Sequence, residues 1–289
     1  MKHIRLFENF QNIDSICKKF GITNWTINAD GTVDVDGNVD LTGKELTKLP
    51  LKFGRVGGYF DCSYNQLTTL EGAPERVGGS FDCSENKLTT LEGGPREVGG
   101  NFDCSYNQLT SLEGSPNGVG LDFYCYSNKL TTLEGAPERV GRSFDCSENK
   151  LTTLEGGPRE VRGYFDCSEN KLTTLEGAPE RVGGDFKCFY NQLTSLEGGP
   201  QSVGGDFNCT ANKLTTLEGA PERVGGSFDC KNNPVYSIYK LFKNHKDFMD
   251  SLDWSYIRGN KIVMSRFEEA CEEAGIKIPK SIKGYKYIQ

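Results

Sequence analysis

The sequence predicts an α+β repeat solenoid, in which a parallel β-sheet runs through most of the chain and helices cap both ends. Three observations predict it. Nine of the 11 cysteines recur at a constant step of 21 residues, which indicates a repeat array. Within each repeat, Phe and Cys alternate with polar residues, as in a short strand with one buried face. Near each terminus, apolar residues recur at helical spacing.

The repeats divide the chain into three predicted domains. Residues 1–38 are expected to form a cap of one helix and one β-hairpin. Residues 39–238 are expected to form the solenoid of 21-residue units. Residues 239–289 are expected to form a C-terminal helical cap with a basic tail.

The N-terminal segment combines a helical pattern with turn signals. Apolar residues from Leu6 to Phe20 are spaced by four and three, and Gly21 follows, so we expect an amphipathic helix that ends there. Asp30-Gly31 and Asp36-Gly37 lie between alternating apolar residues, which is the strongest short hairpin signal. A small hairpin or meander is therefore predicted before the array.

Each unit of the array reads F-D-C-S-x-N-x-L-T-T-L-E-G-x-P-x-x-V-G-G-x. Eight complete copies run from Phe60 to Ser227, a shortened ninth begins at Phe228, and a divergent copy from Val39 has the character of an N-terminal capping repeat. The strand of a repeat cannot pair with itself. It must pair with the equivalent strand of its neighbour, which predicts a parallel ladder of about 4.8 Å per repeat.

Three columns of the array have predicted structural roles. The Asn that follows each Cys by three residues, as at Asn65, can bond backbone groups of its own turn and of the next repeat. The Gly pairs, such as Gly57-Gly58, suit close backbone stacking that leaves no room for a Cβ atom. The Cys column is expected to be buried core, because side chains of parallel neighbouring strands project in the same direction, which is poor disulfide geometry.

A fourth column holds an acidic residue just before the turn glycine. We expect each of these carboxylates to cap backbone donors of the Glu-Gly turn or to pair with Arg76, Arg96 or Arg139, rather than to form a metal or cation ladder. The column comprises Glu71, Glu92, Glu113, Glu134, Glu155, Glu176, Glu197 and Glu218.

The strand-then-Asn pattern F-D-C-S-x-N-x-L-T-x-L resembles the L-x-L-x-x-N-x-L motif of leucine-rich repeats, with Phe and Cys in the two strand leucine positions. The 21-residue period and the Pro-containing return segment resemble the short bacterial class. The resemblance covers Val39 to Ile238. It implies a curved, leucine-rich-repeat-like solenoid whose strands line a concave face that binds partners.

After the array, residues 238–252 have helical spacing, and Ser265-x-x-Glu268 matches a capping box that opens a second helix. Gly275 and Pro279 are expected to stop that helix. The final stretch, residues 275–289, carries four Lys and no acid, so we expect a solvated basic tail. Cys271 is interpreted as a core residue and not as a nucleophile.

The composition excludes several function classes. The chain has only 2 His, and its net charge of −7 disfavours nucleic acid and anionic membranes as partners. The sequence shows no nucleophile with a base, no phosphate loop and no metal cluster, so we expect no enzyme activity, cofactor or metal. A secretory leader and a membrane span are missing too, and with free cysteines this predicts a cytoplasmic protein.

The candidate binding residues lie on the outward side of the strands. The position between Phe and Cys is mostly Asp, which creates a negative field to which Asp122, Asp185 and Asp206 add. Two repeats place aromatic side chains outward instead, and such residues often anchor interfaces. The predicted binding residues are Asp61, Asp82, Asp103, Tyr124, Tyr126, Asp145, Tyr164, Asp166, Lys187, Phe189 and Asp229.

These observations favour protein–protein interaction, with the aromatic positions as anchors and the Asp column steering toward a partner with a basic surface. Three alternatives stay open. The chain captures a small ligand, such as a nucleotide signal, near Tyr124, Tyr164 or the end caps; it is a structural spacer; or the aromatic departures are neutral drift after duplication. The partner and the oligomeric state are not predicted.

The segments flanking the array carry a second resemblance. The similarity is to uncharacterised repeat proteins in tailed-phage and bacterial genomes, and it covers Ile22 to Ile27, the Asp-rich stretch 30–37, Leu49 to Gly54, and the tail from Cys271 to Lys277 through Gly284 to Tyr287. This resemblance implies a phage origin, a host-interaction or counter-defence role, and the host cytoplasm as the site of action.

Overall fold

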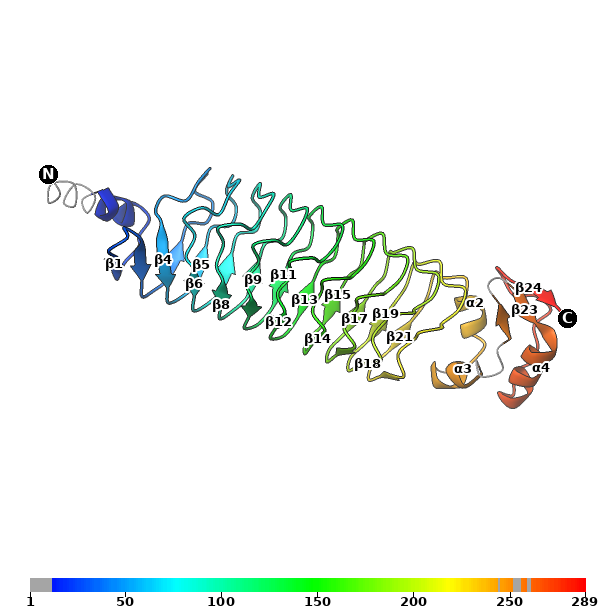
Figure 1. The fold of residues 1–289 in the computed structure, drawn as a ribbon. Coiled ribbons are helices and arrows are strands. Elements are labelled where there is room, and N and C mark those ends of the chain that lie inside the picture. Colours follow the sequence, from blue (N-terminus) through cyan, green and yellow to red (C-terminus); the bar gives the residue numbers. More distant parts are fainter. Residues whose placement is uncertain (1–11, 244, 252–255, 259–260) are drawn as a thin grey trace.

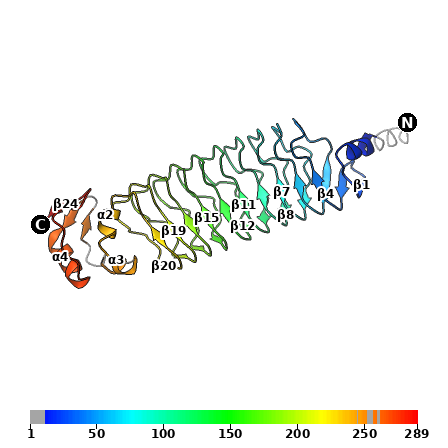
Figure 2. The same cartoon turned by 180° about the vertical axis from the view of Figure 1, so that it is seen from behind.

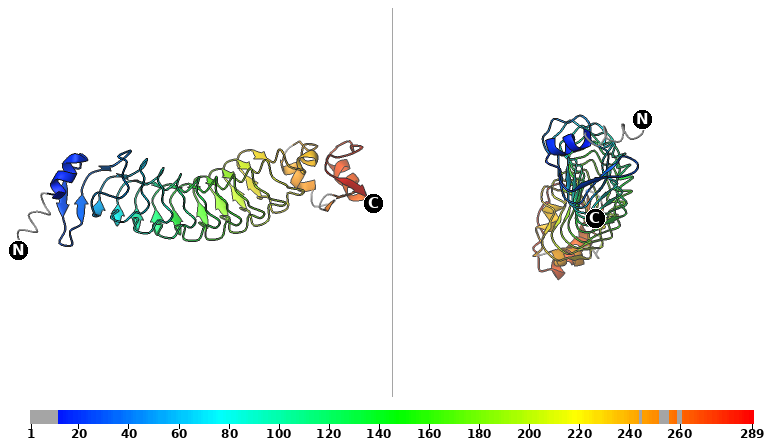
Figure 3. Two further views of the ribbon diagram at one scale, coloured as in Figure 1. Left: turned by 90° about the horizontal axis from the view of Figure 1, so that it is seen from above. Right: turned by 90° about the vertical axis from the view of Figure 1, so that its left-hand side faces the viewer.

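The computed structural model describes residues 12–243, 245–251, 256–258 and 261–289 (Figure 1). The chain forms a parallel β-solenoid with few helices. Figures 1 and 2 show its turns stacked in one long array, with the N-terminal helix at one end and a small C-terminal unit at the other. Viewed from above, the array is extended and twists gradually (Figure 3).

Each repeat contributes a two-residue strand to a ladder that we call the Phe ladder. Its ten strands pair in parallel and in register, so that each Phe lies beside the Phe 21 residues away. The predicted parallel ladder is thus confirmed. Its strands are β3 (Val39–Asp40), β5 (Phe60–Asp61), β7 (Phe81–Asp82), β9 (Phe102–Asp103), β11 (Phe123–Tyr124), β13 (Phe144–Asp145), β15 (Phe165–Asp166), β17 (Phe186–Lys187), β19 (Phe207–Asn208) and β21 (Phe228–Asp229).

A second parallel ladder, the Val ladder, runs through the segment that precedes each Gly pair, and the sequence did not predict it. An exposed polar residue followed by a buried Val is too short an alternation to indicate a strand. Its strands are β2 (Val33–Val35), β4 (Phe53–Val56), β6 (Arg76–Val77), β8 (Glu97–Val98), β10 (Gly118–Val119) and β12 (Arg139–Val140), then β14 (Glu160–Val161), β16 (Arg181–Val182), β18 (Ser202–Val203) and β20 (Arg223–Val224).

The Val ladder is interrupted once, between β12 and β14. At this place the Gly pair of the repeat is replaced by Gly141-Arg142, and in the next repeat by Arg162-Gly163. In most other repeats the Gly pairs let adjacent turns stack closely: a Cβ atom on Gly78 would overlap the carbonyl oxygen of Gly57. The predicted role of the Gly pairs is therefore confirmed.

The core is a set of continuous columns. Nine Phe rings of the Phe ladder stack face to face, with neighbouring ring centroids 5.1–5.6 Å apart and ring planes within 3–14° of parallel. The nine Cys side chains beside them are free thiols with no solvent exposure. Burial raises the pKa of Cys104 and of most of its equivalents well above the usual value, so the thiols are unreactive core groups, as predicted.

The Asn column joins each repeat to the one before it. The side-chain amide of Asn86 donates to the carbonyl oxygens of Cys83, Ser84 and Cys62, and its own oxygen accepts a hydrogen bond from the Leu67 amide at 2.8 Å. The prediction that Asn bonds its own turn is confirmed. Its remaining hydrogen bonds join it to the preceding repeat and not to the next one. The strand N–H groups of each repeat already donate to the carbonyl oxygens of the next repeat.

The N-terminal part agrees with the prediction in two of its three features. Residues 12–19 are helical, with Cys17 fully buried, whereas the first predicted helical positions, Leu6 and Phe10, lie outside the described residues. The strand β1 (Trp25–Ile27) pairs antiparallel with β2 across Asp30-Gly31, so this hairpin is confirmed. Asp36-Gly37 forms no hairpin, because β2 pairs in parallel with β4 and the chain passes on into the Phe ladder.

The C-terminal part is a mixed α/β unit and not a helical cap with a tail. The predicted helix over residues 238–252 is divided into α2 (Tyr236–Tyr239) and α3 (His245–Ser251), and α4 (Met264–Glu273) follows. The capping box is wrong: the residue that caps α4 is Val263, without a side-chain hydrogen bond. Gly275 ends α4 with φ +65°, as predicted.

The basic tail exposes its lysines to solvent, as predicted, but it is folded. Its strand β24 (Lys286–Ile288) pairs in parallel with β23 (Lys261–Val263), which pairs with β22 (Ile257–Arg258). The Tyr285 hydroxyl group donates to the carbonyl oxygen of Thr215 in the array. Alternation explains the difference from the prediction, because the lysines point to solvent while the tyrosines between them are half-buried.

Candidate protein-binding surface

The Asp column first has a local structural role. One carboxylate oxygen of Asp145 accepts hydrogen bonds from the amide and the hydroxyl group of Ser147, at 3.0 and 2.6 Å. This arrangement closes the turn that ends the strand. The same pair of bonds occurs at Asp61, Asp82, Asp103 and Asp166. Asn208 and Asp229 keep the bond to the amide two residues on.

The column also carries an electrostatic cost. Burial, with further repulsion from Asp82 and Asp145, raises the pKa of Asp103 to about 6. Burial and the Asp166 carboxylate raise the pKa of Asp145 to about 6, although Ser147 and Lys187 oppose the shift. Both carboxylates are therefore ionised at neutral pH but would gain from a cation placed beside them.

Asp122 does not add to the negative field as expected. Its side chain is fully buried, and its two carboxylate oxygens accept hydrogen bonds from Arg142 at 2.9 and 2.7 Å. The Ser143 amide donates to it as well. Burial by itself would raise the pKa of Asp122, but these hydrogen bonds outweigh it and hold the pKa below the usual value. The Arg142 guanidinium therefore compensates this charge.

The first aromatic patch is larger than predicted. The Tyr126 ring makes edge contacts with Tyr106, at a centroid distance of 5.2 Å, and with Tyr124, at 6.5 Å. Tyr106 is 45% exposed and was not among the predicted binding residues. It occupies the variable position before the Asn, where a left-handed backbone with φ 51° turns the side chain outward. That recurring position is the sequence signal that could have identified it.

The second aromatic patch is smaller and lies within one repeat. Phe189 contacts Tyr190 at a centroid distance of 5.7 Å, and Tyr190 is 60% exposed at the same left-handed position. Both patches therefore combine an aromatic residue that replaces the usual Ser with a Tyr that precedes the Asn.

Tyr164 lies between the two patches. The Lys187 Nζ atom lies 5.1 Å from the centroid of the Tyr164 ring and 3.5 Å from the Asp166 carboxylate. The Tyr124 hydroxyl group interacts with Asp122 and Tyr164. Burial, followed by the nearby carboxylates, raises the pKa of both tyrosines, so each hydroxyl group stays protonated and able to donate a hydrogen bond.

The structure brings eight of the predicted residues together on five consecutive strands, from β9 to β17. They are Asp103, Tyr124, Tyr126, Asp145, Tyr164, Asp166, Lys187 and Phe189. The other three lie toward the ends of the Phe ladder: Asp61 and Asp82 on β5 and β7, and Asp229 on β21, where it pairs with Lys231 at 2.9 Å.

The Glu column does not have the predicted role. The Glu71 amide donates to the Thr69 hydroxyl group, so the threonine supplies the side-chain bond in this turn, and the Glu71 carboxylate lies 3.8 Å from Lys52. The expected arginine partners pair elsewhere: Arg76 with Glu97 and Arg96 with Glu75, each at 3.6 Å. These pairs link neighbouring strands of the Val ladder.

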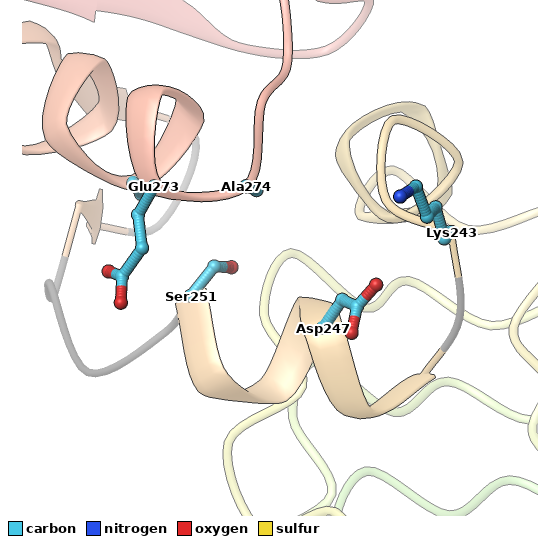
Figure 4. Close-up of a pocket in the computed structure, with 6 residues that line it drawn as sticks. Lys243, Asp247, Ser251, Glu273 and Ala274 are labelled. Atoms are coloured by element: carbon cyan, nitrogen blue, oxygen red, sulfur yellow. The ribbon is translucent and has the colours of Figure 1, made fainter.

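A pocket lies between α3 and α4 at the C-terminal end. Figure 4 shows Lys243, Asp247, Ser251 and Glu273 around it. It is remote in sequence from the residues predicted on the Phe ladder. Within the described part of the chain, no group of three His, Cys, Asp or Glu side chains is placed to hold a metal ion.

Comparison with known proteins assigns the chain to no family. No family model matches the chain, and no curated protein matches it. Among the described helices, none is long and apolar enough to cross a membrane.

Proposed function

We propose that this chain is a non-enzymatic interaction protein that binds a partner protein on the outward side of the Phe ladder. In the leucine-rich-repeat resemblance this side is the concave face. The observation that carries the proposal is the pair of outward aromatic patches, one at Tyr106, Tyr124 and Tyr126 and one at Phe189 and Tyr190, on a face whose other repeats carry Asp and Ser. Tyrosine anchors beside a column of carboxylates suit a partner with a basic surface.

The net charge of the array also favours a partner with a basic surface. Residues 39–233 contain 19 Lys and Arg against 28 Asp and Glu, a net charge of −9. Such a field would speed encounter with a basic protein and repel nucleic acids and anionic ligands. With the resemblance to phage and bacterial repeat proteins, we extend the proposal to a phage-encoded host-interaction or counter-defence protein that acts in the host cytoplasm.

The test is an affinity pull-down from a bacterial lysate with mass spectrometry, using the wild-type chain, Tyr124→Ala with Phe189→Ala, and Tyr64→Ala. Tyr64 is an exposed tyrosine far along the same array and serves as the matched control. We expect a protein that the wild-type chain and the control retain and that the double variant loses, with unchanged circular dichroism and melting. Equal retention by the double variant would exclude the aromatic anchors.

The pocket between α3 and α4 favours one second candidate, the capture of a small ligand. Among the described residues, the cationic Lys243 and the anionic Asp247 and Glu273 line this pocket (Figure 4). A thermal-shift screen with nucleotides tests this candidate, which predicts a saturable rise in melting temperature. A structural spacer predicts neither a shift nor a partner.

A further inference from the structure

Two aromatic side chains, which we call the walls, flank a stretch of the Phe ladder whose equivalent positions hold smaller side chains, and we call this stretch the saddle. Tyr126 and Phe189 occupy the same position of repeats that are three steps apart, and Ser147 and Ser168 occupy it in the two repeats between. At about 4.8 Å per strand, the two walls stand about 14 Å apart. The floor consists of the two serines and of the Asp145 and Asp166 carboxylates that bind them.

The first wall packs toward the preceding repeat. The Tyr126 ring contacts Tyr106 in that repeat and Tyr124 in its own repeat, and its hydroxyl group interacts with Ser105. The Asp145 carboxylate is still close enough to help raise the pKa of this hydroxyl group. The second wall, Phe189, packs against Tyr190 in its own turn.

The two carboxylates of the floor differ in their partners. Asp166 is 7% exposed, and Lys187 lies 3.5 Å from its second oxygen. Asp145 uses one oxygen for Ser147, and no described side chain donates a hydrogen bond to its second oxygen; Lys187 lowers the pKa of Asp145 from nearby but forms its ion pair with Asp166. Burial and the Asp166 charge raise the pKa of Asp145 to about 6, so an incoming cation would relieve this repulsion.

We propose that the saddle binds an arginine side chain from a basic segment of a partner protein, with the guanidinium group against the second oxygen of Asp145 and its plane against an aromatic wall. This inference rests on the proposed function. Arginine fits better than lysine because its planar group can donate to a carboxylate and stack on an aromatic ring at the same time, whereas a lysine ammonium is a strongly hydrated point charge.

The experiment uses the full chain and two labelled nine-residue Gly/Ser peptides with blocked ends, one with three arginines and one with three lysines. Fluorescence anisotropy at pH 7.5 and low salt measures their affinities. The arginine peptide is expected to bind more tightly than the lysine peptide. Asp145→Asn is expected to weaken arginine binding roughly tenfold, since a hydrogen bond to a charged group is worth about 1.5 kcal/mol or more.

Asn at position 145 keeps the turn, because Asn208 accepts the Thr210 amide with the same geometry at 3.0 Å. The matched control is Asp82→Asn, which removes the same charge from a repeat without aromatic walls and is expected to change the affinity less than about twofold. Tyr126→Ala removes one wall and is expected to abolish the preference for arginine over lysine.

Three results would overturn the inference: no saturable binding below about 1 mM, equal affinity for both peptides, or equal losses in Asp145→Asn and Asp82→Asn. The outcomes also separate it from the proposed function. If a partner protein depends on Tyr124 and Phe189 but not on Asp145, the proposed function stands and the arginine saddle fails. If arginine binding depends on Asp145 while the captured protein ignores Tyr124 and Phe189, the saddle stands and the proposed function fails.

Discussion

At the scale of the residue, polar side chains in this protein hold the repeats together as firmly as the apolar ones. Asn149 shows this most clearly, because it sits at the junction of two turns. Its amide donates to Cys125, Cys146 and Ser147 carbonyl oxygens, and its oxygen accepts from the Leu130 amide. Removing it would leave these buried backbone groups without partners.

We predict that Asn149→Leu destabilises the protein by about 3 kcal/mol, because several buried backbone groups would lose their bonds at about 1–3 kcal/mol for each uncompensated group. Urea unfolding followed by circular dichroism measures the loss. Lys150→Leu is the control, because Lys150 is the exposed next residue. A loss below about 1 kcal/mol in Asn149→Leu would show that water replaces the amide.

The Asp column predicts a pH dependence of stability. The pKa values of Asp103 and Asp145 in the folded protein are about 6, above the value of about 3.9 in an unfolded chain. The folded state therefore binds more protons between these values. The contribution of these two carboxyl groups to the free energy of unfolding is therefore largest below about pH 4 and is lost as the pH rises through 6. The groups facing them are Asp82, Tyr124, Asp166 and Lys187.

We expect the double variant Asp103→Asn with Asp145→Asn to be more stable than the wild type at pH 7.5, by about 1 kcal/mol for each carboxylate replaced. Asn keeps the turn bond and removes the buried charge. Unfolding free energies at pH 5 and pH 7.5 test this. The wild type should be more stable at pH 5 than at pH 7.5, and this difference between the two pH values should be smaller in the variant. A variant that is less stable at pH 7.5 would contradict the prediction.

At the scale of the element, the distance between turns depends on glycine. Gly78 adopts an ordinary backbone conformation, and close approach to the preceding turn is what requires it. The Gly72 position is different, since its φ of +93° is itself unfavourable for other residues. With the second glycine of each pair, as at Gly79, these columns hold 23 of the 35 glycines and explain most of the high glycine content.

We predict that Gly78→Ala destabilises the array by about 2 kcal/mol or more, because the added methyl group meets the backbone of Gly57 and the ladders must separate locally. Thermal unfolding measures the effect. Gly118→Ala is the control, because the nearest atoms to its added methyl group lie 3.7 and 3.9 Å away, at ordinary contact distance. Equal melting temperatures for the two variants would show that the turns can separate at little cost.

At the scale of the whole molecule, the array fixes the distances between its outward side chains. Repeat proteins tolerate the loss of a unit because each repeat contacts its neighbours alone. The spacing of Tyr126 and Phe189 then depends only on how many repeats lie between them.

We expect that deleting residues 165–185, a whole repeat inside the saddle whose loss leaves Asp145 and Ser147 in place, preserves the fold but abolishes binding of the arginine peptide, since the walls would stand two strands apart instead of three. Deleting residues 81–101, an equivalent repeat outside the saddle, should preserve both. Circular dichroism and peptide affinity distinguish the two effects. Unchanged affinity after the first deletion would show that the spacing of the walls is irrelevant.

The sequence by itself determined the period, the buried columns, the Phe ladder and the outward positions of Tyr126 and Phe189, because repetition places every residue beside its equivalent 21 positions away. Only the tertiary structure decided the Val ladder, the burial of Asp122 under Arg142 and the approach of Lys187 to Tyr164. The contacts of Asp122 and Lys187 join different columns, and side-chain direction governs them, whereas the Val ladder joins equivalent residues whose alternation is too short to indicate a strand. It also decided the C-terminal sheet, where Tyr285 and Lys286 belong to no repeat and their place depends on packing against the array.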